Sequence, residues 1–207
     1  MLRGKKIALY AISDDVLTPD ETVLEQTRES LEAGVDIFQY RNKIKTDEEV
    51  KDICIALQNL CREYGVTFII DDRPHLAQEI GADGLHIGKH DMPIAEARKI
   101  FPKGVIGVSC YASVRNAIEA EAEGADYVAF GSFFPSPTKP KSGIAPMSVI
   151  GRAKEAVKVP VCVIGGINAE NVHELVKEKP DMISVVSGIY EGCITSNVKT
   201  FLKELEK

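Results

Sequence analysis

Three short stretches decide the expected fold: AGVD at residues 33–36, GADG at 81–84 and GADY at 124–127. Each stretch follows a segment of helical period and opens a short apolar run. Glycine suits the left-handed position at the C-terminal end of a helix, and the small residue and the aspartate lead into the next strand. The recurrence predicts that the chain uses one kind of helix-to-strand junction repeatedly.

On either side of these junctions, short apolar or β-branched runs alternate with amphipathic helical segments along the whole chain. The predicted strands are Ile7–Ile12, Asp36–Tyr40, Thr67–Ile70, Gly84–Ile87, Val105–Val108, Tyr127–Phe130, Val161–Ile164 and Ile183–Val186. The predicted helices begin near Asp20, Asp47, Pro74, Pro93, Ser113, Met147, Ala169 and Thr195. Eight units share 207 residues, which leaves about 26 residues for each βα pair.

This pattern predicts one α/β domain over residues 1–207, a (β/α)8 barrel whose active site lies at the C-terminal ends of the strands. A doubly wound sheet is the alternative architecture, but it does not normally need eight parallel strands in so short a chain. No linker or block of charge interrupts the alternation. A second domain is therefore not expected.

The composition excludes several classes of protein. A net charge of −6 argues against a general nucleic-acid binder. No apolar run approaches the roughly 18 residues that span a bilayer, and the N-terminal stretch is too short for a signal peptide. The five cysteines are scattered without a Cys-x-x-Cys pair, so neither a zinc site nor a disulfide framework is indicated. We expect a cytoplasmic protein with small-molecule partners, no nucleic-acid or membrane partner, and a homo-oligomer as one possible assembly.

Cationic side chains follow the second predicted strand. Alternate residues of an extended segment share a face, so Gln39, Arg41 and Lys43 should point together. The alternative is a solvated basic loop. Ser109 follows the fifth strand and can donate a hydrogen bond to phosphate. A proline-rich loop after the sixth strand could bring Lys139 over an anionic ligand; the alternative is a flexible linker, but a linker rarely follows a Phe-Phe pair such as Phe133-Phe134.

Carboxylates follow the third and fourth strands. Asp72 and Asp91 suit Mg²⁺, a hard ion that takes oxygen ligands and often binds through one or two carboxylates and a substrate phosphate. As an alternative, Asp71 or Asp72 could cap the helix near Pro74, and Asp91 the helix near Pro93. His86 lies inside a strand and is more often a hydrogen-bonded core histidine than a ligand.

Glycines follow the seventh and eighth strands, where barrels commonly bind phosphate. Gly166 permits close approach of the backbone, and Ser187 lies opposite it in the next unit. The cationic and carboxylate groups suit a diphosphate, whereas this neutral cradle suits a monophosphate. A site with both regions predicts a diphosphate leaving group that meets a second, phosphorylated substrate. No convincing protein nucleophile is present, and Cys110 lacks a paired histidine.

The same residues carry a resemblance to a known family. The motifs, in order, are QYRNK (39–43), DDR (71–73), ADGLHIGKHD (82–91), GVS (107–109), GADYVAFGSFFPSPTK (124–139), IGGI (164–167) and SVVSGI (184–189). Their order and spacing resemble the thiamine-phosphate synthase family over nearly the whole chain. The resemblance implies a (β/α)8 transferase of thiamine biosynthesis that joins hydroxymethylpyrimidine diphosphate to a thiazole phosphate and releases diphosphate.

The resemblance also implies roles for individual residues. Asp72 and Asp91 would be the Mg²⁺ ligands. The pyrimidine diphosphate would contact Gln39, Tyr40, Arg41, Asn42, Lys43, Asp71, Ser109 and Lys139. The thiazole phosphate would contact Ser136, Pro137, Thr138, Gly166, Val186 and Ser187. The catalytic groups would be Arg41, Lys43, Ser109 and Lys139, which stabilise the departing diphosphate in a dissociative substitution.

One position departs from the family pattern, which usually has asparagine where this chain has Asp71. An ionised aspartate cannot donate a hydrogen bond to a diphosphate oxygen, so the role of this residue is an open question. Three alternative functions are weighed against the synthase. They are a thiazole tautomerase, which would not need the diphosphate-binding set, a non-catalytic paralogue that binds thiamine phosphate, and a phosphate-binding barrel isomerase, which would need a general acid and base.

Overall fold

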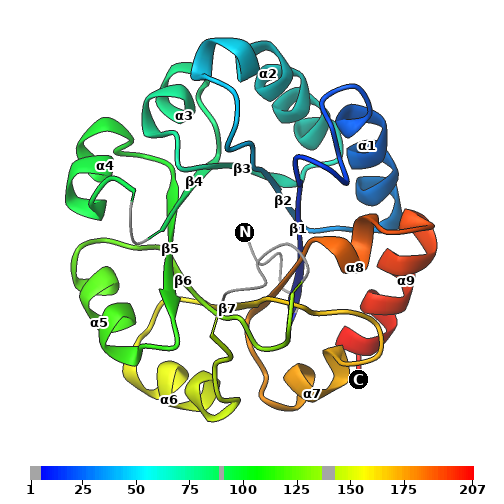
Figure 1. Ribbon diagram of the computed structural model, residues 1–207. Coiled ribbons are helices and arrows are strands. Elements are labelled where there is room, and N and C mark those ends of the chain that lie inside the picture. The colour runs from blue at the N-terminus through cyan, green and yellow to red at the C-terminus, as the bar shows by residue number, and fades with distance from the viewer. Residues whose placement is uncertain (1–5, 89–90, 137–142) are drawn as a thin grey trace.

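The eight predicted strands close into a parallel barrel surrounded by helices, which confirms the (β/α)8 architecture (Figure 1). The computed structural model describes residues 6–88, 91–136 and 143–207. The strands are β1 Ala8–Ile12, β2 Ile37–Tyr40, β3 Thr67–Asp71, β4 Gly84–Ile87, β5 Val105–Tyr111, β6 Tyr127–Phe130, β7 Val161–Ile164 and β8 Met182–Val185. Each strand pairs with its neighbour in the sequence, and β8 closes the barrel against β1.

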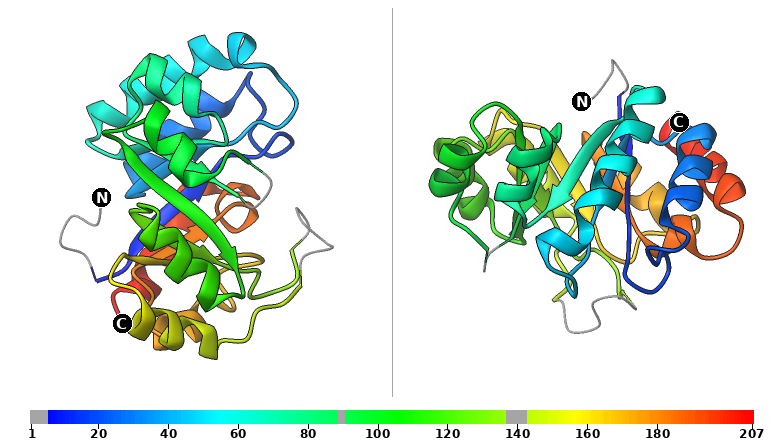
Figure 2. Two further views of the ribbon diagram at one scale, coloured as in Figure 1. Left: turned by 90° about the vertical axis from the view of Figure 1, so that its left-hand side faces the viewer. Right: turned by 90° about the horizontal axis from the view of Figure 1, so that it is seen from above.

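Helices surround the barrel on its outside (Figures 1 and 2). They are α1 Val23–Ala33, α2 Asp47–Glu63, α3 Pro74–Ile80, α4 Ile94–Ile100, α5 Val114–Ala122, α6 Ser148–Ala156, α7 Val172–Lys177, α8 Ser187–Tyr190 and α9 Ile194–Leu205. The short helix α8 was not predicted, because four residues are too few to show a helical period. Within the described ranges, no helix is both long and apolar enough to cross a membrane.

The repeated junction stretches explain how the strands are joined at the N-terminal end of the barrel. Gly34 and Gly81 end α1 and α3 in the left-handed conformation, with φ of 115° and 63°. The aspartate that follows each glycine accepts a hydrogen bond from a backbone N–H of the preceding strand. Asp36 accepts from Leu9 at 3.0 Å, and Asp83 accepts from Phe68 at 2.9 Å.

The same bond recurs in the second half of the chain. Asp126 accepts from the N–H of Ile106, and Asp181 accepts from the N–H of Val161, both at 2.8 Å. The four aspartates stand before β2, β4, β6 and β8, so the junction repeats once for every two βα units. Asp181 was missed in the sequence because Lys179 and Pro180 replace the small residues of the other junctions.

Two layers of apolar side chains hold the barrel. The larger layer lies between the strands and the helices. The smaller lies inside the barrel and consists of Ala8, Tyr10, Ile12, Ile37, Ile69, Tyr127, Ala129, Cys162 and Met182. Tyr10 and Tyr127 meet edge to face inside the barrel, with ring centroids 6.2 Å apart. The inner layer forms a floor beneath the cavity at the C-terminal ends of the strands.

Candidate active site

A cavity of about 360 Å³ lies at the C-terminal ends of the strands. Eleven of the residues singled out in the sequence line it: Gln39, Arg41, Lys43, Asp71, Asp72, Asp91, Ser109, Ser136, Gly166, Val186 and Ser187. Three others, Pro137, Thr138 and Lys139, lie outside the described residues. The location agrees with the barrel rule that the loops after the strands build the active site.

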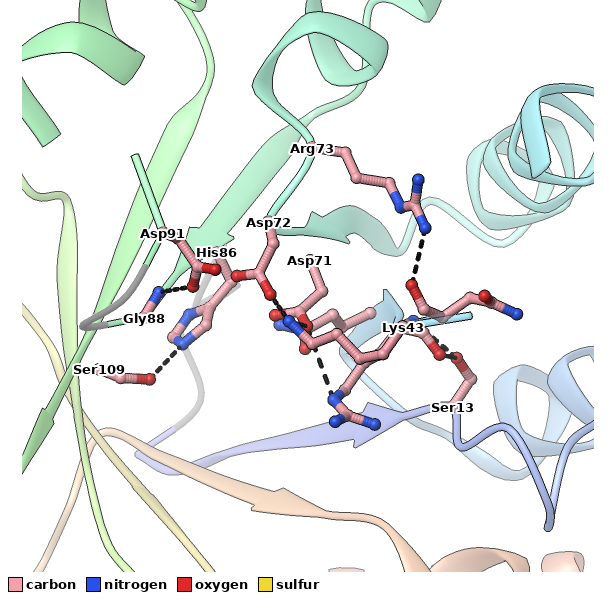
Figure 3. Close-up of polar contacts among 12 residues, drawn as sticks. Ser13, Lys43, Asp71, Asp72, Arg73, His86, Gly88, Asp91 and Ser109 are labelled. Atoms are coloured by element: carbon pink, nitrogen blue, oxygen red, sulfur yellow. Dashed lines mark hydrogen bonds and ion pairs between the residues drawn. The ribbon is translucent and has the colours of Figure 1, made fainter. Parts of the chain in front are cut away.

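The cationic wall of the cavity is an ion-pair cluster (Figure 3). Lys43 Nζ lies 3.1 Å from Asp71 Oδ2 and also contacts Asp72 Oδ2, while Arg41 Nε lies 3.6 Å from Asp71 Oδ2. The Asp71 side chain is only 9% exposed, but that of Lys43 is 43% exposed. Lys43 can therefore turn toward a ligand in the cavity, whereas Asp71 is held in the wall.

Tyr40 and Asn42 were predicted to contact substrate, but their side chains are used elsewhere. The Tyr40 hydroxyl donates to Asp20 Oδ1 at 2.9 Å, on the helix side of the strand. Asn42 Oδ1 accepts from the backbone N–H groups of Ile44 and Lys45, at 3.0 and 2.8 Å. Neither residue lines the cavity. Successive residues of a strand face opposite sides, so their neighbours Gln39, Arg41 and Lys43 face the cavity instead.

Arg73 supports the loop that carries the cations. Its guanidinium donates to the carbonyl oxygen of Asn42 at 2.8 Å and pairs with Asp47 at the start of α2. In Figure 3 it points away from the carboxylates of Asp71 and Asp72. Arg73 therefore belongs to the support of the site, although it stands in the same motif as the two aspartates.

Asp72 and Asp91 line the same cavity. The Asp72 backbone is left-handed, with φ of 58°, and its N–H donates to the carbonyl of His86 at 2.8 Å. Asp91 Oδ2 accepts from the N–H of Gly88 at 2.7 Å, and no hydrogen bond to its other oxygen is found among the described residues. The capping alternatives are not observed, because the N-cap positions of α3 and α4 are Arg73 and Pro93.

These two carboxylates fit Mg²⁺ bound together with a substrate phosphate. Magnesium commonly keeps several waters and takes only one or two carboxylates from the protein. Among residues 6–88, 91–136 and 143–207 there is no group of three or more His, Cys, Asp or Glu side chains that could hold a metal alone. The donor set therefore suits a metal that arrives with a diphosphate better than a metal bound in a closed protein cage.

The floor of the cavity contains polar residues that the sequence did not single out as functional. Gln39 Nε2 donates to the Tyr10 hydroxyl at 2.6 Å, and the Tyr10 and Tyr127 hydroxyls are 3.0 Å apart. His86 contacts Tyr127 through Nδ1 at 2.8 Å and Ser109 Oγ through Nε2 at 2.9 Å. Burial raises the pKa of both tyrosines well above their ordinary value, so both hydroxyls keep their protons. His86 is hydrogen-bonded as expected, but it also lines the cavity.

The opposite wall is neutral and built from backbone. Gly165 and Gly166 have φ of 106° and 66°, both in the region that favours glycine. A Cβ on Gly166 would lie 2.3 Å from the carbonyl oxygen of Pro135, so only glycine fits against the loop after β6. Phe134 donates its N–H to the carbonyl of Gly165 at 3.0 Å, and this bond joins that loop to the end of β7.

None of the buried cysteines is an activated nucleophile. Burial raises the pKa of the Cys110 thiol to about 12, so the nucleophilic thiolate is scarce near neutral pH. Cys162 lines the cavity floor, where burial raises its thiol pKa further. The arrangement is therefore suited to binding anions and holding two ligands, not to covalent catalysis by a thiol.

Comparisons with known proteins agree with this geometry. The thiamine monophosphate synthase family matches residues 9–189. A thiamine-phosphate synthase from Wolinella succinogenes is 45% identical over 186 residues, which cover 89% of this chain and 86% of that protein. A thiamine-phosphate synthase from Pyrococcus furiosus is 39% identical over 202 residues, covering 98% of this chain and 94% of that protein.

A solved structure extends the likeness to three dimensions. A thiamine phosphate pyrophosphorylase from Pyrococcus furiosus superposes with a TM-score of 0.88 at 37% sequence identity, covering 98% of this chain and 96% of that chain. The matched segment 9–189 contains every described residue that lines the cavity. By sequence along most of its length and by fold, the chain belongs to the thiamine monophosphate synthase family.

Proposed function

We propose that the protein joins hydroxymethylpyrimidine diphosphate to thiazole phosphate by a dissociative substitution in this cavity. Its family makes it a thiamine-phosphate synthase, an enzyme of the transferase class. The products are thiamine phosphate and diphosphate. The observation that carries the proposal is the asymmetry of the cavity, which has cations beside carboxylates on one wall and a neutral glycine wall on the other.

The cationic wall binds the diphosphate. Arg41 and Lys43 face the phosphate oxygens, and Ser109 adds a hydrogen-bond donor from β5. When the bond between the pyrimidine methylene and the diphosphate oxygen breaks, its electron pair leaves with the diphosphate. The fixed cations then stabilise more charge in the transition state than in the ground state, which lowers the barrier. Lys139, which lies outside the described residues, is proposed to add a third cation.

Asp72 and Asp91 would hold Mg²⁺ with the diphosphate. The bound ion would neutralise part of the charge on the leaving group. Asp71 keeps Lys43 and Arg41 on the cavity wall in the absence of substrate, at 3.1 and 3.6 Å. We assign Asp71 this positioning role, because a carboxylate in contact with two cations cannot also donate to a phosphate oxygen.

The glycine wall holds the thiazole phosphate. Gly166, Ser136 and Ser187 line the cavity there, together with Val186. A thiazole held at this wall has its ring nitrogen close to the pyrimidine methylene, and the nitrogen lone pair forms the new carbon–nitrogen bond. Holding both reactants in one cavity replaces a bimolecular encounter, which is a large part of the catalysis expected without a protein nucleophile.

The alternatives lack support from the cavity. A thiazole tautomerase needs only the neutral wall. Its reaction would not use the charged cluster, which consists of Arg41, Lys43, Asp72 and Asp91. A barrel isomerase needs a general acid and base, and this wall fits that need poorly, because Asp71 and Asp72 are paired with Lys43. Asp71 is the one feature that suits a non-catalytic paralogue. An aspartate at this position also has a use in an active enzyme, because it contacts two cations of the cavity wall. Cytoplasmic location and homo-oligomerisation stay predictions.

The proposal is tested with purified protein, both synthetic substrates, and Mg²⁺ either added or chelated. We expect thiamine phosphate to form only with the metal present. Absence of product with Mg²⁺ present would exclude the synthase. Asp91→Ala and Lys139→Ala should each lose most of the turnover while the protein stays folded by circular dichroism, and thiazole phosphate should still bind to both variants. Normal turnover in either variant would remove that residue from the mechanism.

A further inference from the structure

Five polar side chains form one continuous hydrogen-bonded chain across the cavity floor. It runs from Gln39 on β2 through Tyr10 on β1, Tyr127 on β6 and His86 on β4 to Ser109 on β5. The successive distances are 2.6, 3.0, 2.8 and 2.9 Å. Gln39 and Ser109 stand at its two ends, and both line the cavity. The mechanism above uses Ser109 but assigns nothing to the three residues between them.

The first of these hydrogen bonds, from Gln39 to Tyr10, determines which partner donates in each of the others. The Gln39 amide nitrogen only donates, so Tyr10 accepts from it and sends its own proton to Tyr127. Tyr127 accepts that bond and sends its proton to Nδ1 of His86. A neutral imidazole that accepts at Nδ1 carries its proton on Nε2, so His86 donates to Ser109 Oγ.

The other tautomer of His86 does not fit this arrangement. With its proton on Nδ1, His86 would donate to Tyr127, and Tyr127 would have to donate to Tyr10. Tyr10 would then accept from both Gln39 and Tyr127, and the hydrogen bonds found among the described residues give its own proton no acceptor. Tyr10 is 1% exposed, and a buried donor without an acceptor is costly.

We propose that His86 is a positioning residue, held as the Nε2–H tautomer by the chain from Gln39 through Tyr10 and Tyr127, and that it thereby keeps the Ser109 hydroxyl as a donor toward substrate. Ser109 accepts from His86, so its own proton is directed elsewhere, and the side chain lines the cavity. An anionic ligand needs a donor at that point. This role for Ser109 rests on the proposed function, whereas the tautomer of His86 does not.

The tautomer is measured first, on the full-length protein without substrate. Long-range ¹H–¹⁵N correlation spectra distinguish protonated from unprotonated ring nitrogens, and the spectrum of a His86→Gln variant identifies the resonances of His86. We expect a proton on Nε2 and none on Nδ1. A proton on Nδ1, or on both nitrogens, would overturn the proposal whatever reaction the protein catalyses. Tyr127→Phe removes the donor to Nδ1 and should produce a mixture of tautomers.

The link to Ser109 is tested by a double-mutant cycle in the thiamine-phosphate assay. Ser109→Ala should lower kcat/KM for the pyrimidine diphosphate about 10- to 100-fold, as expected for a lost bond to a charged ligand. Tyr127→Phe should cause a smaller loss by itself and almost no further loss in the Ser109→Ala background, because it acts through Ser109. Independent, multiplicative losses would mean that Tyr127 supports the barrel only, and would overturn the coupling.

Tyr64→Phe is the matched control. It also removes one tyrosine hydroxyl hydrogen bond, to Glu32 at 2.8 Å, but on the outer surface at the end of α2. It should leave both the His86 tautomer and kcat/KM unchanged. If the wild-type protein forms no thiamine phosphate, the proposed function is refuted. The tautomer measurement would still decide in which direction the hydrogen bonds between Gln39 and Ser109 donate.

Discussion

Gly166 offers the sharpest test of the neutral wall, because a single methyl group there should lower both the free energy of unfolding and kcat/KM for thiazole phosphate. Its φ is 66°, and a Cβ would lie 2.3 Å from the carbonyl oxygen of Pro135 and 2.6 Å from that of Phe134. Gly81 provides a matched control at the end of α3. Its φ is 63°, and a Cβ there would meet nothing within 4 Å.

The two substitutions by alanine share one cost and differ in another. The left-handed conformation costs a residue with a Cβ about 1–2 kcal/mol, and this applies equally to Gly81 and Gly166. Ordinary contact begins at 3.4 Å, so the Pro135 carbonyl would have to retreat by 3.4 − 2.3 = 1.1 Å. Forcing a methyl group into a packed site adds about 1–3 kcal/mol. We therefore expect Gly166→Ala to lose about 2–5 kcal/mol and Gly81→Ala about 1–2 kcal/mol.

The displacement should also reach the substrate. The carbonyl that must move belongs to the residue before Ser136, which lines the cavity. A misplacement of about 1 Å can cost roughly 100-fold in catalysis, so kcat/KM for thiazole phosphate should fall about 10- to 100-fold in Gly166→Ala. The value for the pyrimidine diphosphate should change less, because the cationic wall lies on other strands. Gly81→Ala should leave both values unchanged.

Two measurements on each variant decide the matter: the free energy of unfolding from urea titration, and kcat/KM for thiazole phosphate with the other substrate saturating. Equal destabilisation of the two variants, with unchanged kcat/KM in Gly166→Ala, would show that the close approach of Pro135 to Gly166 is unimportant. The neutral wall would then have to be assigned to other residues.

Three further predictions concern charge. Lys43→Gln should raise KM for the pyrimidine diphosphate about 10- to 100-fold, whereas Lys45→Gln, which breaks only the pair with Asp20, should leave it unchanged. Asp71→Asn should tighten binding of inorganic diphosphate about tenfold by calorimetry, because it releases two cations for the ligand and adds a donor; weaker binding would show that the two cations need Asp71 to hold them toward the ligand, and would contradict this prediction. Burial raises three thiol pKa values from 9.0 to about 12, so the unfolded chain loses these protons first and the free energy of unfolding should fall as pH rises above 9.0. The thiols are those of Cys54, Cys61 and Cys110. When one of these cysteines is replaced by alanine, urea titrations at a series of pH values should show a fall that is shallower by about 1.4 kcal/mol per pH unit, and an unchanged slope would contradict the prediction.

The strands were predictable because they are buried on both faces. A strand inside a barrel needs a continuous apolar run, and the boundaries of β4, β6 and β7 agree with the predicted ones. The prediction ended β5 at Val108, but the strand continues to Tyr111 through an irregularity in its pairing with β6. A β-bulge of this kind depends on the partner strand, and it has no signal in the residues of the strand itself.

The side of each strand that faces the cavity was only partly predictable. Alternation placed Gln39, Arg41 and Lys43 on one face, as the structure has them. The family motif as a whole added Tyr40 and Asn42, which point to Asp20 and to the local backbone instead. A motif therefore identifies a segment that matters, but it does not separate the residues that touch the ligand from those that hold the segment.

The sequence by itself determined the number of βα units, the parallel barrel, the cations and carboxylates at the strand ends, and the glycine wall. These follow from local periodicity and from residue type, which are properties of neighbouring positions. Only the tertiary structure decided that Tyr10, Tyr127 and His86 join Gln39 to Ser109, because these residues come from five strands spread over a hundred positions. It also decided that Asp71 pairs with Lys43 and Arg41, since an ion pair depends on distance in space and not on spacing along the chain.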